Sequence, residues 1–145
     1  MSIYMKYEGI EGEVTGKYKG WIELDVCQIV RNTGGGGSIY KPDVFVVKDQ
    51  DNVSIELFNE FVANKGKKVT VDFVEGTEAP FMSIEMEGVT ITNITVSGRG
   101  GSDQKKPIES ITLKPTKISQ SAKPTASSKD PKVTKDNVQW NLVLE

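Results

Sequence analysis

Apolar and polar residues alternate with a period of two along much of the chain, which is the pattern of β-strands that bury one face. The clearest case lies between Tyr18 and Lys48, where one parity is apolar and the other is polar or small: Ile22, Leu24 and Val26 against Glu23, Asp25 and Cys27. Residues Val44–Val47 are apolar throughout, which favours burial on both faces. This stretch therefore predicts two strands joined by a glycine-rich connection.

The same alternation predicts further strands over residues 3–7, 69–73, 82–87, 89–96, 108–113 and 138–144. Gly88 is expected to separate two of them. Within 89–96 the apolar positions change parity after Ile91. Because a one-residue shift moves the apolar set of a strand to its other face, we expect a bulge or bend near Asn93.

One stretch has the period of an α-helix. Its apolar residues recur at spacings of three and four and form one stripe: Val53, Leu57, Phe58, Phe61 and Val62. Gly66 is a natural residue just past the end of this helix. A helix this short is marginal alone, so the whole stripe, Phe58 included, is expected to dock in the core. Seven or eight strands and one flanking helix predict an α+β, mostly β fold.

Length and composition fit one domain over residues 1–145, with a flexible Ser-, Lys- and Pro-rich loop at about 119–132. A net charge of −2 without a basic stripe gives no reason to expect nucleic acid. The chain has no apolar run of 18 residues, so no membrane insertion is expected. Met1–Lys6 lacks the apolar segment of a signal peptide, so we expect synthesis in the cytoplasm without a cleaved signal.

Catalytic groups are scarce. The sequence has no histidine and one cysteine, Cys27, which excludes histidine-based zinc sites, Ser–His and Cys–His catalysis and internal disulfides. Cys27 is expected to be a buried structural thiol. Carboxylates lie two apart at Glu23 and Asp25 and at Glu85 and Glu87, but exposed strand faces look the same. We therefore predict no enzyme, no cofactor and no metal site.

The connection after the second predicted strand contains four consecutive glycines, Gly34–Gly37. Such a loop adopts many backbone conformations and loses much entropy when it is ordered. It lacks the Lys-Ser/Thr pair of a phosphate-binding loop, as does Gly98–Gly101. We expect a neighbouring copy of the chain to hold Gly34–Gly37 in place.

Several segments follow the order found in one known family: Glu8–Glu13, Lys19–Leu24, Ser54–Gly66, Val89–Gly98, Pro107–Leu113 and the strand around Trp140. Together they cover most of the chain and resemble the hemolysin-coregulated proteins (Hcp), the tube proteins of bacterial type VI secretion. The resemblance implies a β-barrel, or two packed antiparallel sheets, with one flanking α-helix, related in fold to phage tail tubes. It also implies hexameric rings that stack into a secreted hollow tube. The chain departs from the family in its shorter glycine loop and its lack of histidine.

The resemblance further implies partners: other copies of the chain, a contractile sheath, a spike protein and effectors carried in the lumen. The family's loop after the second strand contacts the adjacent ring, which assigns ring stacking to Arg31, Asn32, Thr33, Gly34, Gly35, Gly36 and Gly37. Gln28 is the candidate for the lumen, because it is polar and shares the parity of Ile22 and Leu24. A strand end that turns to solvent would explain Gln28 equally well.

Two other interpretations stay open. A major tail-tube protein of a phage or another contractile particle would share the architecture. A stand-alone carbohydrate-binding β-sandwich would need exposed aromatic residues, for which Tyr18, Trp21, Tyr40 and Trp140 are the candidates. Their positions at strand starts or on apolar faces favour core residues instead. A hydrolase that uses only carboxylates is the remaining enzymatic alternative.

Overall fold

The computed structural model describes residues 1–30, 42–76, 80–98, 100–101, 106–122 and 140–144, the last segment by its backbone alone. In chain order the elements are β1 (Ser2–Tyr7), a 3-10 turn (Gly16–Tyr18), β2 (Ile22–Leu24), β3 (Val26–Val30), β4 (Asp43–Asp49), α1 (Ser54–Ala63), β5 (Lys67–Val74), β6 (Met82–Ser97), β7 (Ile108–Lys114), β8 (Lys117–Ala122) and β9 (Trp140–Leu144). The mostly β fold with one α-helix that the sequence predicts is confirmed. No helix in these segments is long and apolar enough to cross a membrane.

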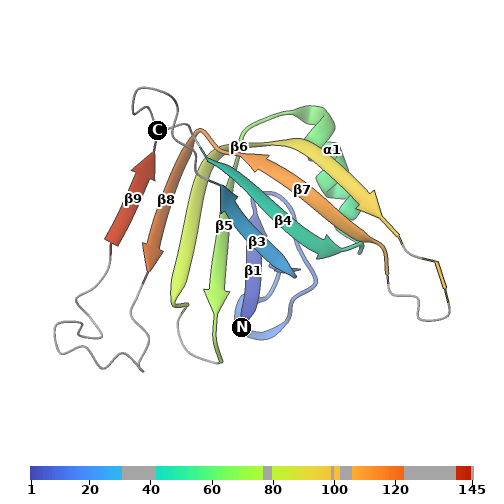
Figure 1. The fold of residues 1–145 in the computed structure, drawn as a ribbon, viewed down its shortest axis with the longest axis horizontal. Coiled ribbons are helices and arrows are strands. Elements are labelled where there is room, and N and C mark those ends of the chain that lie inside the picture. Colours follow the sequence, from blue (N-terminus) through green and yellow to red (C-terminus); the bar gives the residue numbers. More distant parts are fainter. Residues whose placement is uncertain (31–41, 77–79, 99, 102–105, 123–139, 145) are drawn as a thin grey trace.

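The antiparallel strands form a barrel. Their order in the sheet is β2-β1-β5-β6-β7-β4-β3. Because β2 continues through Asp25 directly into β3, the last strand of this order leads back to the first (Figure 1). The Asp25 amide donates to the Val47 carbonyl at 2.8 Å, which extends the β3–β4 ladder to this corner. Strands β8 and β9 lie outside the circuit and extend the sheet from β6.

The longest strand, β6, belongs to both halves of the barrel. Its first half pairs with β5 on one edge and β8 on the other, and its second half, Thr90–Ser97, pairs with β7. The register shifts between Ile91 and Asn93, which confirms the predicted bulge. The expected break at Gly88 is wrong, because the strand runs through this residue. Gly88 has a φ of +61° and passes so close to Thr116 that a Cβ would lie 2.2 Å from its Oγ1, so glycine permits the bend.

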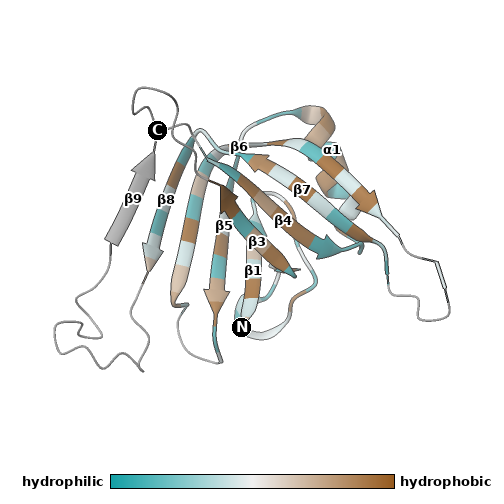
Figure 2. Ribbon diagram, in the orientation of Figure 1, coloured by the Kyte–Doolittle hydropathy of each residue, from teal (hydrophilic) through white to brown (hydrophobic). Residues whose placement is uncertain are grey.

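Buried side chains from β1, β2, β4, β5, β6, β7 and α1 fill the interior, and β3 adds only partly buried ones. Apolar and polar bands alternate along β5 and β6 (Figure 2). The expected burial of the whole helical stripe is wrong. Val53 and Leu57 are buried, whereas Phe58 and Val62 are 52% and 67% exposed. The barrel covers only one side of α1, and that side is already occupied by Leu57. The helix ends with Asn64 in the left-handed conformation (φ 53°), two residues before Gly66.

The alternation between Ile22 and Val26 also changes phase. Ile22 and Leu24 are buried, but Cys27 and Ile29 are the residues of β3 that pack against the core, and Val26 is 45% exposed. The corner at Asp25 causes this change, because the chain turns there from one pairing partner to another.

Two further expectations on strand limits need correction. Val44 and Val46 are fully buried while Phe45 and Val47 are half-buried, so β4 has one core face and not two. The loop expected from residue 119 does not include 119–122, because these residues belong to β8. Ile118 and Gln120 point inward there, and residues 123–132 lie outside the described part of the chain.

Candidate functional site

Several strand edges have no pairing partner among the described residues: the short strand β2 has none opposite β1 and β9 has none opposite β8, and two longer unpaired edges belong to the barrel. The first is the edge of β3 opposite β4. Ile3 pairs with Leu24, so β1 starts too late to continue along β3. The second is the edge of Thr90–Ser97 opposite β7, because β5 pairs with β6 only as far as Val89. Open edges present rows of unpaired backbone donors and acceptors to which another strand can bind.

The predicted lumen and stacking residues lie on or after the first of these edges. Gln28 is in the middle of β3, opposite Phe45, and its side chain is exposed. The predicted stacking loop, Arg31–Gly37, follows β3 directly and lies outside the described residues. Both assignments stay predictions.

A buried charged cluster that sequence reasoning missed ties β4, β7 and α1 together. The Lys48 side chain is fully buried, and its Nζ donates to Asp51 Oδ1 at 2.7 Å and to the Asp49 carbonyl at 2.7 Å. Glu109 Oε2 lies 3.4 Å from the same nitrogen, and Lys48 and Glu109 are direct cross-strand partners. Asp51 Oδ1 also accepts from the Val53 amide at 3.1 Å, so the cluster fixes the start of α1. The sequence contains one sign of this cluster. Lys48 and Glu109 have opposite charges, and each occupies a position at which the alternation of its strand calls for an apolar residue.

A second polar cluster surrounds Asp72 on β5. Its carboxylate accepts from Tyr18 Oη at 2.9 Å and from Ser83 Oγ at 2.6 Å. Burial, and then the bond to Asp72, raises the pKa of the Tyr18 phenol to about 12. The Tyr18 ring stacks on Tyr4 and meets Trp21 edge-on. Tyr18 is therefore a core residue and not an exposed platform for sugar rings; Tyr40 and the Trp140 side chain lie outside the description.

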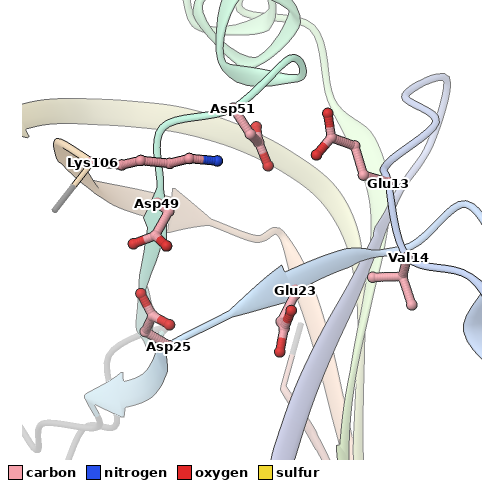
Figure 3. A pocket seen from close by; sticks show the side chains of 7 residues that line it. All are labelled: Glu13, Val14, Glu23, Asp25, Asp49, Asp51 and Lys106. Carbon is pink, nitrogen blue, oxygen red and sulfur yellow. The ribbon is translucent and has the colours of Figure 1, made fainter.

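An acidic pocket of about 280 Å³ opens where β2 and β4 diverge (Figure 3). Its lining residues are Glu13, Val14, Glu23, Asp25, Asp49, Asp51 and Lys106. The carboxyl groups of Asp25 and Asp49 face each other. Burial, and then the Asp49 charge, raises the pKa of the Asp25 carboxyl above its usual value. Within the described segments, no group of three or more His, Cys, Asp or Glu is arranged to hold a metal ion.

Asp25→Asn is expected to raise the melting temperature at pH 7. A raised pKa means that the folded chain binds this proton more tightly than the unfolded chain, so the associated stability is present at low pH and is lost as pH rises through the raised pKa. At pH 7 the two carboxylates repel, and the amide relieves this. The gain measured by thermal unfolding should shrink toward pH 3, and Glu85→Gln on the exposed face of β6 is the control. A lower melting temperature at pH 7 would contradict the repulsion.

The remaining candidates for chemistry are structural. Cys27 is half-buried against the core, and burial raises the pKa of its thiol to about 12, so it is protonated at neutral pH. Glu85 and Glu87 lie on the exposed face of β6. This arrangement favours a protein that works through its surfaces and its strand edges.

Comparison with known proteins gives a family match. The model of the family described as "Type VI secretion system effector, Hcp" matches residues 4–121. A solved type VI secretion system effector from Yersinia pestis has 19% identity and a TM-score of 0.76, with 99% of this chain and 98% of that one covered. Hcp1 from E. coli EAEC 042 has 17% identity and a TM-score of 0.74, with 97% of both chains covered.

A third structural match is Hcp2 from Salmonella typhimurium, with 18% identity, a TM-score of 0.68, and 84% of this chain and 87% of that one covered. At these identities the structural matches establish the fold. No curated protein matches the chain. The phage tail-tube and carbohydrate-binding alternatives find no support in these comparisons.

Proposed function

The chain belongs to the Hcp family of type VI secretion system effectors, and we propose that six copies of it close a ring and that such rings stack into a secreted hollow tube. The role is structural and not enzymatic. The partners are other copies of the chain, the contractile sheath, the spike protein and the effectors that travel in the lumen.

The pair of open strand edges is the observation that carries this proposal. They belong to different elements, β3 and the second half of β6. Contact between two different surfaces of identical chains is heterologous, and it closes a ring when the rotation between copies fits. Electron microscopy of the purified chain at high concentration tests the proposal. Rings and end-to-end tubes are expected, and a field of separate monomers would refute it.

For ring stacking we propose the loop Arg31–Gly37, which leaves β3 at one open edge. Gly35→Val combined with Gly36→Val adds bulk and restricts the backbone of this loop. The fold should stay intact by circular dichroism while tubes are lost and single rings remain. Gly100→Val is the matched control, since a Cβ there meets nothing within 4 Å. Tubes of normal length in the double variant would exclude the loop from stacking.

For the lumen we propose Gln28. Its exposed side chain on β3, an uncharged strand, supports a surface that effectors can pass or contact without strong electrostatic trapping. Gln28→Ala should leave rings intact, and weaker retention of a co-purified effector by such rings is the expected change.

A further inference from the structure

The sheet made of β3, β4, β7 and the second half of β6 carries no charge at the centre of its outward face. Alternate residues of these strands, such as Val44, Val46 and Ile111, are buried, so the residues between them face outward. The pairing registers align the outward residues in two central rows: one consists of Gln28, Phe45, Thr112 and Asn93, and the other runs from Val26 and Val47 to Thr95. Every residue of the central rows is exposed or half-buried, and none is charged.

This lack of charge is a property of one face and not of the chain. Charged residues make up 26% of the sequence. They return beyond the central rows, where Lys114 and Asp43 form an exposed ion pair at 3.5 Å. The outward face of the other sheet is charged as well, since Lys6 pairs with Thr70 and Thr70 pairs with Glu85, and both Lys6 and Glu85 are exposed.

The central rows contain an apolar patch formed by Phe45, Val47 and Val26. Phe45 and Val47 are two residues apart on β4 and share its outward face, and Val26 lies directly opposite Val47 on β3. Such cross-strand neighbours are close enough for their side chains to touch. The patch is accessible, because Val26 is 45% exposed and the other two are half-buried. Phe45 has uncharged hydrogen-bonding residues, Gln28 and Thr112, on either side.

We propose that Phe45, together with Val47 and Val26, selects what the lumen carries, and that the preferred passenger is a polypeptide segment with apolar side chains between uncharged ones. The inference rests on the proposed ring, in which Gln28 faces the lumen, because Gln28 and Phe45 are direct cross-strand partners on one face. The Phe45 ring supplies the largest apolar contact area of the patch. A charged passenger segment would lose water at this face without meeting an opposite charge. Six copies would present six patches, so that weak contacts add up.

Synthetic peptides test the chemistry of this selection. Three peptides share one Ser- and Gly-rich sequence and carry leucine, glutamate or lysine at the same positions, and fluorescence anisotropy measures their binding to assembled rings. We expect the leucine peptide to bind at least about tenfold more tightly than either charged peptide. Its affinity should not fall between about 0.1 M and about 1 M salt, because apolar contacts are not screened.

Substitutions locate the contact, with ring assembly of each variant checked first by native mass spectrometry. Phe45→Thr should weaken binding of the leucine peptide by at least about tenfold, whereas Phe45→Leu should retain it. Val47→Thr keeps the shape of the side chain and adds a hydroxyl group, so a smaller loss is expected, and this variant decides if Phe45→Thr chains form no rings. Phe58→Ser is the matched control, because Phe58 is an exposed aromatic residue on α1, outside the central rows.

The outcomes separate this inference from the proposed function. Equal binding of the three peptides, binding that weakens with salt, or undiminished binding by the Phe45→Thr rings would overturn the inference and leave the ring in place. Loss of binding in Phe58→Ser would assign the contact to α1, which also overturns it. An unchanged chain that stays monomeric at every concentration would refute the proposed function, and the inference with it.

Discussion

Lys48→Met is expected to lower the free energy of unfolding by about 3–5 kcal/mol, the usual cost of leaving one partner of a buried ion pair alone. The substitution removes the cation between Asp51 and Glu109, and the Glu109 side chain is only 5% exposed. Its carboxylate would then have to stay buried without its partner or take up a proton. Urea unfolding at pH 7 and low protein concentration measures the loss.

Two further variants show whether the loss comes from the unpaired charge. Lys114→Met removes the exposed ion pair with Asp43, in which both side chains are more than 40% exposed, and should cost less than about 1 kcal/mol. Glu109→Leu added to Lys48→Met should restore most of the stability, because an apolar pair of similar size needs no compensating charge. A Lys48→Met chain as stable as the Lys114→Met control would contradict this account.

Leu57→Ala should cost about 2–5 kcal/mol, since it leaves a cavity where α1 meets the barrel. Leu57 is 1% exposed and belongs to the core cluster. Ile55→Ala, on the same helix and 69% exposed, should cost less than about 1 kcal/mol in the monomer. Thermal and urea unfolding of both variants checks the contrast. Equal losses would show that both sides of the helix are packed within one chain.

The helix shows how far periodicity leads and where it stops. The spacing of its apolar residues predicts the element and its approximate limits. It does not show which apolar residues face the barrel, because Phe58 and Leu57 both fit an apolar stripe. One barrel surface buries a limited arc of a helix. The apolar residues left over, Ile55, Phe58 and Val62, are exposed in the single chain.

Alternation along the strands also predicts the fold only where a strand keeps the same pairing partner. Alternation predicts β1, β5 and the bulge in β6, where one sheet face stays inside. It fails at Asp25, because the strand changes partner there and its inward parity changes with it. Tertiary pairing is not written in local alternation. In the buried charged cluster, the sequence shows that Lys48 and Glu109 occupy positions that are otherwise apolar. That the two residues pair with each other follows only from the β4–β7 register.

The sequence predicts the general role of the candidate site, but it does not predict which strand edges form it. Family motifs and the absence of histidine direct attention to assembly and away from catalysis. Which strand edges stay open depends on where β1 begins and where β5 ends relative to their neighbours. That information exists only in the pairing registers.

Native mass spectrometry of the unmodified chain across a concentration series tests most directly whether identical copies complete the open edges of β3 and of the second half of β6. The account predicts a dominant particle with six times the 15.9 kDa mass of the chain and multiples of it as rings stack. A 15.9 kDa species that persists from low to high concentration would contradict it.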